Sequence, residues 1–233
     1  MNTKVKTQEF FKAYAKVKEL NIKAYERIRN EIHSGNTEKE LYEKVVDTYL
    51  SNTDGKAKYT GDFISGKRTC DIEGEATDKV IENGDTIIVD ALVALDGIHC
   101  DTTRTFFCGE PTDEQRAVYT LLCNILEEAK ALLKPNVKVC EIFRFVDEKI
   151  KEAGYGGLVH HAGHSLGYEW CENPRFIEEN EDVLEENMLV TLEPGLYLEN
   201  KFGIRIENNY RVTENGGINV FDYSTDINHF ILK

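Results

Sequence analysis

The feature that most constrains this 233-residue chain is an expected β-hairpin that carries two aspartates. The run GDTIIVD ends at Asp90, the run HCDTTRTF contains Asp101, and Asp96-Gly97 lies between them. Asp-Gly between two strand-like runs is a strong signal for a two-residue turn. That turn would place Asp90 opposite Thr103, and Asp101 would point to the same face because strand side chains alternate with period two. We therefore expect the two carboxylates to converge.

Three further side chains with metal-ligand chemistry lie in strand-like or glycine-flanked segments. Glu193, in VTLEPGLYL, and Glu207, in FGIRIEN, are equidistant from Asn200. A hairpin centred there, with Gly203 easing the turn, would set the two glutamates opposite one another. His164 lies in HHAGHSLG, where glycines on both sides allow close approach of the backbone to a site.

Together these residues make four carboxylates and one imidazole, a hard and mostly oxygen ligand set. A lone strand carboxylate is usually solvated, but Asp90 directly follows Ile87, Ile88 and Val89, where a buried carboxylate is costly without a partner. A metal ion is the usual partner of several converging carboxylates. The set favours a pair of divalent ions, Mn²⁺, Co²⁺, Fe²⁺ or Zn²⁺, over a tetrahedral structural zinc site.

Composition excludes several classes of function. The formal net charge is −14 and no basic patch is present, which argues against nucleic-acid binding. The six cysteines form no CxxC pair, and the N-terminal MNTKVKTQEF has no apolar core of a signal peptide, so we expect a reducing cytoplasm. No apolar run approaches the ~20 residues of a membrane-spanning helix. We expect a protein without nucleic-acid or membrane partners.

The spacing of apolar residues and the positions of helix-capping and helix-breaking residues predict helices and strands in alternating groups. Apolar residues at three- and four-residue spacing, interrupted by Asn21, predict a helix over about 8–33, and a capping box at Thr37 starts a second helix that ends near Leu50. A second capping box, Thr112 with Gln115, starts a helix that Pro135 ends. The remaining predictions are a helix over about 138–153 and strands near 59–65, 86–94, 98–107, 158–164, 188–198, 202–213 and 218–221.

This order, two helices then strands and again two helices then strands, is a repeat of architecture without a repeat of residues. No linker, low-complexity tract or composition shift divides the chain. We therefore expect a single domain over 1–233, with halves of about 1–110 and 111–233 and no separate N-terminal domain.

Taken in order, GDTIIVD, CDTTRTF, HHAGHSLG, TLEPGLY and GIRIEN resemble the five ligand-bearing motifs of the pita-bread metallopeptidases: methionine aminopeptidase, aminopeptidase P and prolidase. The resemblance covers roughly residues 60 to 215. It implies an α+β fold, a pseudo-twofold ααββ repeat with a curved antiparallel sheet and a dinuclear centre. By this resemblance Asp90 would chelate one metal, His164 with Glu193 the other, and Asp101 and Glu207 would bridge them.

The function implied is hydrolysis of an amide bond at the N-terminus of a peptide. Two divalent ions can generate a nucleophilic hydroxide at neutral pH, and Glu193 could transfer its proton. TRTF, EPGLY and GIRIEN look closer to the Xaa-Pro branch, so we expect an Xaa-Pro dipeptidase or aminopeptidase with manganese as the first metal to test. The alternatives are a methionine aminopeptidase, or a member that keeps the metals without peptidase activity. The oligomeric state, a homodimer included, stays open.

Three more residues near these motifs are candidates for the site. His160 corresponds to a histidine that contacts substrate in the proline-specific branch, and it either does so here or makes a structural hydrogen bond. His161 is interpreted as structural. Arg205 lies two residues before Glu207, so on a strand it would share its face and could offset the negative charge of the cluster.

The chain departs from the family pattern at two positions. The family usually has a substrate-binding histidine seven residues after the metal-binding one, and here that position is Cys171, a weak donor or an ordinary packed cysteine. The family also usually has a histidine shortly before the first metal aspartate, but none occurs between His33 and His99. Both departures bear on peptidase activity.

Overall fold

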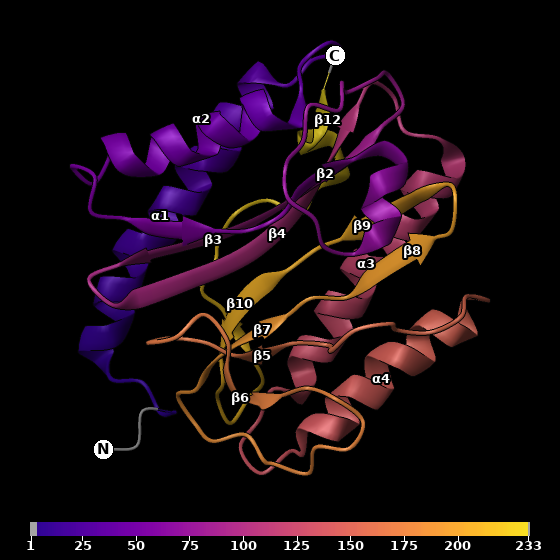
Figure 1. Ribbon diagram of the computed structural model, residues 1–233. Helices are drawn as coiled ribbons and strands as arrows, with labels where there is room; N and C mark the ends of the chain where they lie inside the picture. Colours follow the sequence, from indigo (N-terminus) through magenta and orange to yellow (C-terminus); the bar gives the residue numbers. More distant parts are fainter. Residues whose placement is uncertain (1–3, 233) are drawn as a thin grey trace.

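The chain runs twice through a pair of helices followed by antiparallel strands (Figure 1). The computed structural model describes residues 4–232. The first run contains α1 (Gln8–Glu31), α2 (Glu38–Ser51), β1 (Lys58–Thr60), β2 (Phe63–Ser65), the 3-10 helix η1 (Gly66–Asp71), β3 (Thr86–Leu95) and β4 (Ile98–Cys108). The second contains α3 (Asp113–Ala129), η2 (Lys130–Leu132), α4 (Val139–Glu152), β5 (His164–Ser165), β6 (Glu172–Arg175), β7 (Leu189–Leu192), β8 (Gly195–Leu198), β9 (Phe202–Arg205), β10 (Asn208–Arg211) and β11 (Ile218–Asn219), and η3 (Ile227–His229) and β12 (Ile231–Leu232) follow.

The long β3–β4 hairpin forms as predicted. Asp90 pairs with Thr103 in its register, and Leu95 pairs with Ile98 at its tip. The turn residues Asp96 and Gly97 have φ values of 52° and 77°, the left-handed pair that a type I′ turn requires. Because this turn fixes the register, Asp90 and Asp101 share one face of the sheet.

Helix α1 packs against this hairpin through one apolar face and a single buried amide. The buried face of α1 includes Asn21, the residue that interrupts the spacing of the apolar residues. Asn21 Nδ2 donates to Ala91 O at 2.7 Å and to Thr102 Oγ1 at 3.0 Å, and the Tyr49 hydroxyl of α2 donates to Asn21 Oδ1 at 2.7 Å. Asn21 therefore links α1 and α2 to Ala91 and Thr102, the residues that follow Asp90 and Asp101.

The second sheet has the order β11-β10-β7-β5-β6, and β8 and β9 form a separate hairpin. Gly195 pairs with Arg205 in β8–β9, and Leu192 pairs with Asn208 in β7–β10. Both ladders are centred on residue 200, so Glu193 and Glu207 lie between them in the same register, which confirms the predicted opposition. Glu207 N donates to Thr103 O at 3.0 Å, and this bond joins the second sheet to β4.

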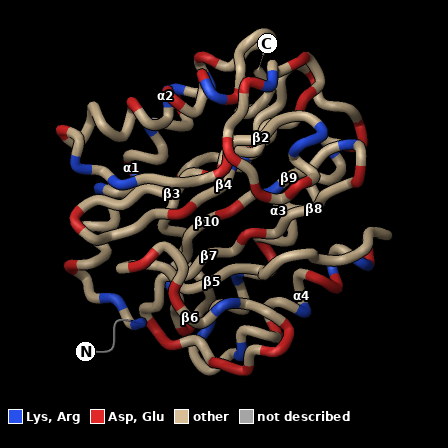
Figure 2. Tube along the Cα trace, in the orientation of Figure 1, with Lys and Arg blue, Asp and Glu red and all other residues tan. Residues whose placement is uncertain are grey.

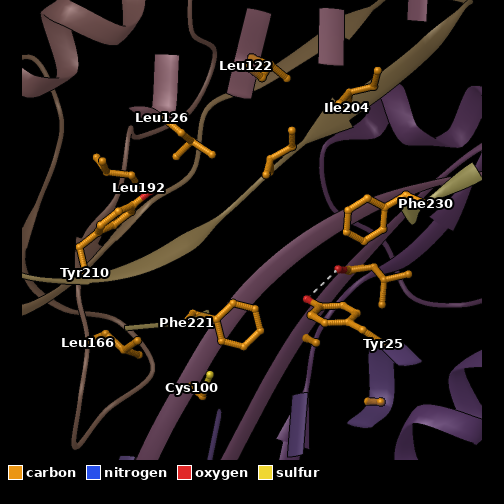
Figure 3. Close-up of a cluster of buried hydrophobic side chains, with 14 of the residues drawn as sticks. Tyr25, Cys100, Leu122, Leu126, Leu166, Leu192, Ile204, Tyr210, Phe221 and Phe230 are labelled. Atoms are coloured by element: carbon orange, nitrogen blue, oxygen red, sulfur yellow. Dashed lines mark hydrogen bonds between the residues drawn. The ribbon is translucent and has the colours of Figure 1, made fainter. Parts of the chain in front are cut away.

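Helices α1 and α2 lie beside the first sheet, and α3 and α4 lie beside the second (Figure 1). A continuous hydrophobic core joins helices from both runs to the strands. Figure 3 shows part of it, in which the rings of Tyr25 and Phe221 lie with centroids 6.3 Å apart. Phe230 packs edge-on against Phe106 of β4 at 5.2 Å, so the C-terminal segment belongs to the same core.

Several predicted strands are shorter than expected, each for a local reason. The 59–65 strand breaks at Gly61, whose φ of 138° turns the chain where a side chain would collide with the Asp90 carbonyl. The 188–198 strand breaks at Pro194, because proline has no N–H for a ladder. The 202–213 strand breaks at Glu207, whose N–H turns to Thr103. Gly203 lies inside β9, packed against the Thr69 carbonyl, so its predicted role in the turn was wrong.

The predicted 158–164 strand is wrong over most of its length, because only His164 and Ser165 are in a strand. Gly163 has a φ of 158° and Gly157 of 101°, and the segment bonds irregularly, with Ala162 N donating to Phe176 O at 2.9 Å. Strands β6 and β12 were not predicted. β12 pairs with two residues of the distant strand β4, and β6 pairs with only two residues of β5. No local sequence pattern therefore indicates either strand.

Acidic positions occur on the central strands β3 and β4 and beside β10, and no continuous run of Lys and Arg crosses the face shown (Figure 2). Within residues 4–232, no helix is long and apolar enough to cross a membrane.

We predict that Asn21→Leu lowers the free energy of unfolding by about 2–4 kcal/mol, because the fully buried Ala91 carbonyl and Tyr49 hydroxyl lose their partner. Urea denaturation followed by circular dichroism measures this loss. Lys16→Ala, on the exposed face of the same helix, is the control and should change stability by less than about 0.5 kcal/mol. Equal stability of the two variants would contradict the role assigned to Asn21.

Candidate metal centre

All five predicted ligands line one cleft of about 120 Å³ between the two sheets. Its other lining residues come from the segment after η1, from β3, β6 and β9, and from the loops before and after β5: Ile72, Glu73, Leu92, His160, His161, Trp170, Arg175 and Arg205. Four of the five ligand side chains sit where a strand ends or where two ladders meet. The structure therefore brings together in one cleft the five residues that the sequence singled out.

Three of the five form the tightest group. Asp101, His164 and Glu207 each offer one ligand atom, and these atoms lie within 4.8 Å of one another. His164 Nε2 lies 3.5 Å from Asp101 Oδ2 and 3.7 Å from Glu193 Oε1. His164 Nδ1 lies 2.8 Å from the Ser165 carbonyl, which can only accept, so Nδ1 carries the proton. Nε2 is then the nitrogen that faces the carboxylates, and its lone pair would be the ligand of a bound metal ion.

The donor set fits a divalent cation. Asp90 Oδ1 and Glu207 Oε1 are buried, and neither has a hydrogen-bond partner among residues 4–232. The second oxygen of each side chain is held, Glu207 Oε2 by Thr103 Oγ1 at 3.0 Å and Asp90 Oδ2 by Arg205 Nη2 at 3.0 Å. A buried carboxylate oxygen without a donor is costly, and an ion between these side chains would remove that cost.

Arg205 is the guanidinium that the sequence placed beside the cluster, and it is only 4% exposed. Besides Asp90, its Nη2 contacts Asp62 Oδ2 at 3.4 Å, and its Nη1 donates to the Ile72 carbonyl at 2.8 Å and to the Tyr197 hydroxyl at 3.0 Å. Arg205 therefore orients Asp90 and anchors two neighbouring segments, and it is not an exposed edge residue.

His160 continues this network. Its Nδ1 lies 2.7 Å from the His161 carbonyl and therefore donates, which leaves Nε2 to accept from the Tyr197 hydroxyl at 3.0 Å. Burial lowers the pKa of His160 to about 4, so the ring is neutral near pH 7. His160 both lines the cleft and makes a structural hydrogen bond. His161, predicted to be structural, instead lies with Nδ1 3.2 Å from Glu193 Oε1.

Burial and mutual repulsion separate the carboxylates into two kinds. Burial raises the pKa of Asp90 and of Glu207 well above ordinary carboxyl values, and the charge of Asp101 raises both further. Burial alone would also raise the pKa of Glu193, but the adjacent imidazoles, His161 first, lower it to about 2. Glu193 is thus ionised at neutral pH while the others need a further cation.

Cys171 lies beside His164. Burial lowers the pKa of this imidazole, but Asp101 first and then the Cys171 thiol raise it, and the net result is a pKa well above the usual value. Cys171 is half-buried and is not among the side chains that line the cleft. The preceding residue, Trp170, does line the cleft and is 52% exposed. The histidine position of the family pattern is thus occupied by a thiol next to a metal-ligand candidate.

Sequence reasoning missed several residues of the cleft and its network, among them Asp62, Glu73, Tyr197 and Arg175. Tyr197 could have been found, because period two places it on the same face as Glu193. Glu73 and Arg175 come from segments whose position depends on packing between distant parts of the chain, and no local signal marks them.

Residues 12–214 match the sequence profile of metallopeptidase family M24. The chain belongs to this family. The M24 chain is 36% identical over 215 residues to a protein of Pyrococcus furiosus named Xaa-Pro dipeptidase, an alignment that covers 91% of this chain and 61% of that protein. The chain thus spans about three fifths of the length of this relative.

Solved structures of similar proteins have the same fold. An Xaa-Pro dipeptidase from Bacillus anthracis superposes with a TM-score of 0.92 at 28% identity, covering 98% of this chain and 64% of that one. The prolidase from Pyrococcus furiosus superposes with a TM-score of 0.88 at 35% identity, covering 95% of this chain and 66% of that one. The pita-bread fold predicted from the five motifs is confirmed.

We predict that the metal-free M24 chain loses thermal stability as pH rises from about 5 to 8. The folded-state pKa values of Asp90 and Glu207 are raised above those of the unfolded chain, so their favourable protonated forms are present at low pH and are lost as pH rises. Calorimetry after exhaustive chelation measures the melting temperature at each pH.

Glu207→Gln is the matched variant, since it removes the charge and keeps the shape. Without metal at pH 8 it should melt above the wild type, and with divalent metal present it should melt below. A metal-free melting temperature that is independent of pH, or that rises across this range, would contradict the prediction.

Proposed function

We propose that this M24 chain hydrolyses Xaa-Pro dipeptides and that its centre holds two divalent ions. The observation that carries the proposal is the convergence of five ligand side chains in one cleft, with two buried carboxylate oxygens left without donors. The names of the relatives, Xaa-Pro dipeptidase and prolidase, support the substrate class.

In this proposal Asp90 would hold one ion, His164 and Glu193 would hold the other, and Asp101 and Glu207 would serve both. When bound, the ions lower the pKa of a water molecule towards neutrality and polarise the scissile carbonyl. Manganese is the first metal to test, with cobalt, iron and zinc as alternatives, because the donor set is mostly oxygen.

The chain's own residues handle the proton and orient the reacting groups. Glu193 is ionised at neutral pH, so it can take a proton from water and deliver it to the leaving amine. Thr191 Oγ1 donates to Glu193 Oε1 at 3.0 Å and fixes the carboxylate plane. His161, next to the same oxygen, would stabilise the charge that Glu193 carries before the first transfer and again after the second. Arg205 keeps Asp90 turned towards the cleft.

Arg175 supports a dipeptide as the substrate. It lines the cleft with an exposed side chain, and no side-chain hydrogen bond or ion pair of Arg175 occurs within residues 4–232. Its register partner in the sheet is His164, so the guanidinium lies at the histidine side of the centre. Arginine binds a carboxylate through two parallel hydrogen bonds. A free carboxylate lies this close to the scissile bond only in a very short peptide.

We also propose a cytoplasmic location. All six cysteines are free thiols in the structure, which suits a reducing compartment.

We predict that wild type supplied with manganese contains about two ions per chain and releases proline from Xaa-Pro dipeptides, and that Glu207→Ala loses more than half of the metal and all hydrolysis. Loss at both sites is expected because a bridging ligand serves both ions. Elemental analysis and a colorimetric proline assay measure the two quantities. Glu199→Ala, an exposed glutamate of the β8–β9 turn, is the control and should retain both.

The outcomes separate the candidate functions. Cleavage of methionyl-alanine peptides without cleavage of Xaa-Pro identifies a methionine aminopeptidase, and two bound metals with no cleavage of any peptide identify a member without peptidase activity. Xaa-Pro amides, which lack the terminal carboxylate, should be cleaved less efficiently than the free dipeptides if Arg175 binds that group. Less than about half an ion per chain in the wild type would contradict the metal centre itself.

We predict that Cys171 slows the reaction and that Cys171→His increases kcat on Xaa-Pro dipeptides. A thiol is a weak hydrogen-bond donor, and loss of one donor to a developing oxyanion typically costs about 10²–10³ in rate. Steady-state kinetics measure the gain. Cys171→Ala is the control, since it removes the thiol without adding a donor. If Cys171→His is no faster than Cys171→Ala, the residue at this position does not act on the substrate carbonyl.

A further inference from the structure

Two exposed side chains of opposite charge line the metal cleft, Glu73 and Arg175. Neither side chain makes an ion pair or hydrogen bond within residues 4–232, and no ion pair joins them to each other. The other carboxylates of the cleft are metal-ligand candidates, of which Asp101, Glu193 and Glu207 are buried and Asp90 is half-buried. Glu73 is therefore the acidic group of this cleft that is available to a ligand at the rim.

Glu73 lies on the Asp90 side of the cleft. Its two neighbours in the chain are bonded to Asp62 and to the Arg205 guanidinium that holds Asp90. Arg175 lies on the opposite side, paired in register with His164. The cleft thus has an acidic rim near one proposed metal and a basic rim near the other, which sets a direction for a peptide with charged ends.

The backbone on both sides of Glu73 is anchored. The Ile72 carbonyl accepts from Arg205 Nη1 at 2.8 Å, and Gly74 N donates to Asp62 Oδ1 at 3.0 Å. Ile72 has a φ of 71°, a left-handed conformation that is strained for a β-branched residue and persists only where its surroundings enforce it. Glu73 is therefore presented from a fixed position.

Apolar surface lies in the same cleft as this carboxylate. Trp170 is 52% exposed, and Leu92 and Ile72 complete the apolar lining. An aliphatic side chain that ends in a cation can lay its methylenes on such surface while its charged end reaches an exposed carboxylate. Lysine and arginine side chains have this chemistry.

We propose that Glu73 makes this site prefer substrates whose first residue carries a cationic side chain, with the stem of that side chain against Trp170. The inference rests on the proposed dipeptidase function. The substrate carboxylate faces Arg175, its amine faces the Asp90 side of the centre, and the side chain of its first residue extends to the rim. Since every substrate has the amine, the side-chain charge alone provides the discrimination.

The test compares lysyl-proline with norleucyl-proline, which has the same stem without the charge. In the manganese-loaded wild type, kcat/KM for lysyl-proline should be higher by roughly two- to fivefold, the range of an exposed ion pair, and the difference should lie mainly in KM. Glu73→Gln should reduce the ratio to about one, and Glu73→Lys should invert it and improve glutamyl-proline. Raising ionic strength from about 0.01 M to about 1 M should shrink the wild-type ratio, because screening shortens from about 30 Å to about 3 Å.

Glu75→Gln is the matched control, because Glu75 is an exposed glutamate of the same segment that lines a different groove beside α2. This variant should keep the wild-type ratio. Hydrolysis of both peptides at equal kcat/KM, or an unchanged ratio in Glu73→Gln, overturns the inference and leaves the proposed function intact. If no Xaa-Pro peptide is cleaved, the proposed function fails, and calorimetric titration of the two uncleaved peptides into the metal-loaded protein decides the inference: equal affinities overturn it, and tighter lysyl-proline binding that Glu73→Gln abolishes supports it.

Discussion

Repulsion among four buried carboxylates is the constraint on which the rest of this structure depends. Two unit charges 4 Å apart repel by about 4 kcal/mol at an effective dielectric constant of 20. The chain supplies one guanidinium, Arg205, beside Asp90, and imidazoles beside Glu193 and Asp101. Burial, and then the charges of Asp101, Glu193 and Asp90, raise the pKa of Glu207 well above its usual value, and His164 offsets this only in part. The arrangement is stable in its ionised form only with a further positive charge between the strands.

Hydrogen bonds from buried side chains to the backbone of the ligand residues hold the ligands in place against this repulsion. Asn209 Nδ2 donates to the Asp101 carbonyl at 2.6 Å, and the Tyr14 hydroxyl holds Asn209 Oδ1 at 2.6 Å. Arg104, fully buried, donates to the Glu207 carbonyl at 2.6 Å and to the Thr103 carbonyl at 2.9 Å, so it clamps the junction of the two sheets. Ligand side chains held by such a shell cannot move apart to relieve their charge.

The ligand geometry could be predicted from the sequence because each pair depends on a local rule. The Asp96-Gly97 turn fixes Asp90 against Thr103, and the centre of symmetry at residue 200 fixes Glu193 against Glu207. The rim could not be predicted this way. The segment that bears Glu73 is placed by an arginine 132 residues later in the chain, and Arg175 is placed by β6, a strand that pairs irregularly with β5.

The five ligands form the floor of the cleft, and Glu73, Trp170 and Arg175 form its rim. This division has a functional consequence. Each of the five ligands sits on a paired strand or directly beside one, where a shift of one residue would turn its side chain to the opposite face and destroy the centre. The segments that bear Glu73 and Trp170 contribute no ligand, so a substitution there changes the charge or shape of the cleft without moving the five ligand side chains. The same metal centre can therefore be kept while the choice of substrate is altered. In this chain the segment that bears Trp170 departs from the pattern of the family motifs at Cys171, whereas the five ligands do not depart from it.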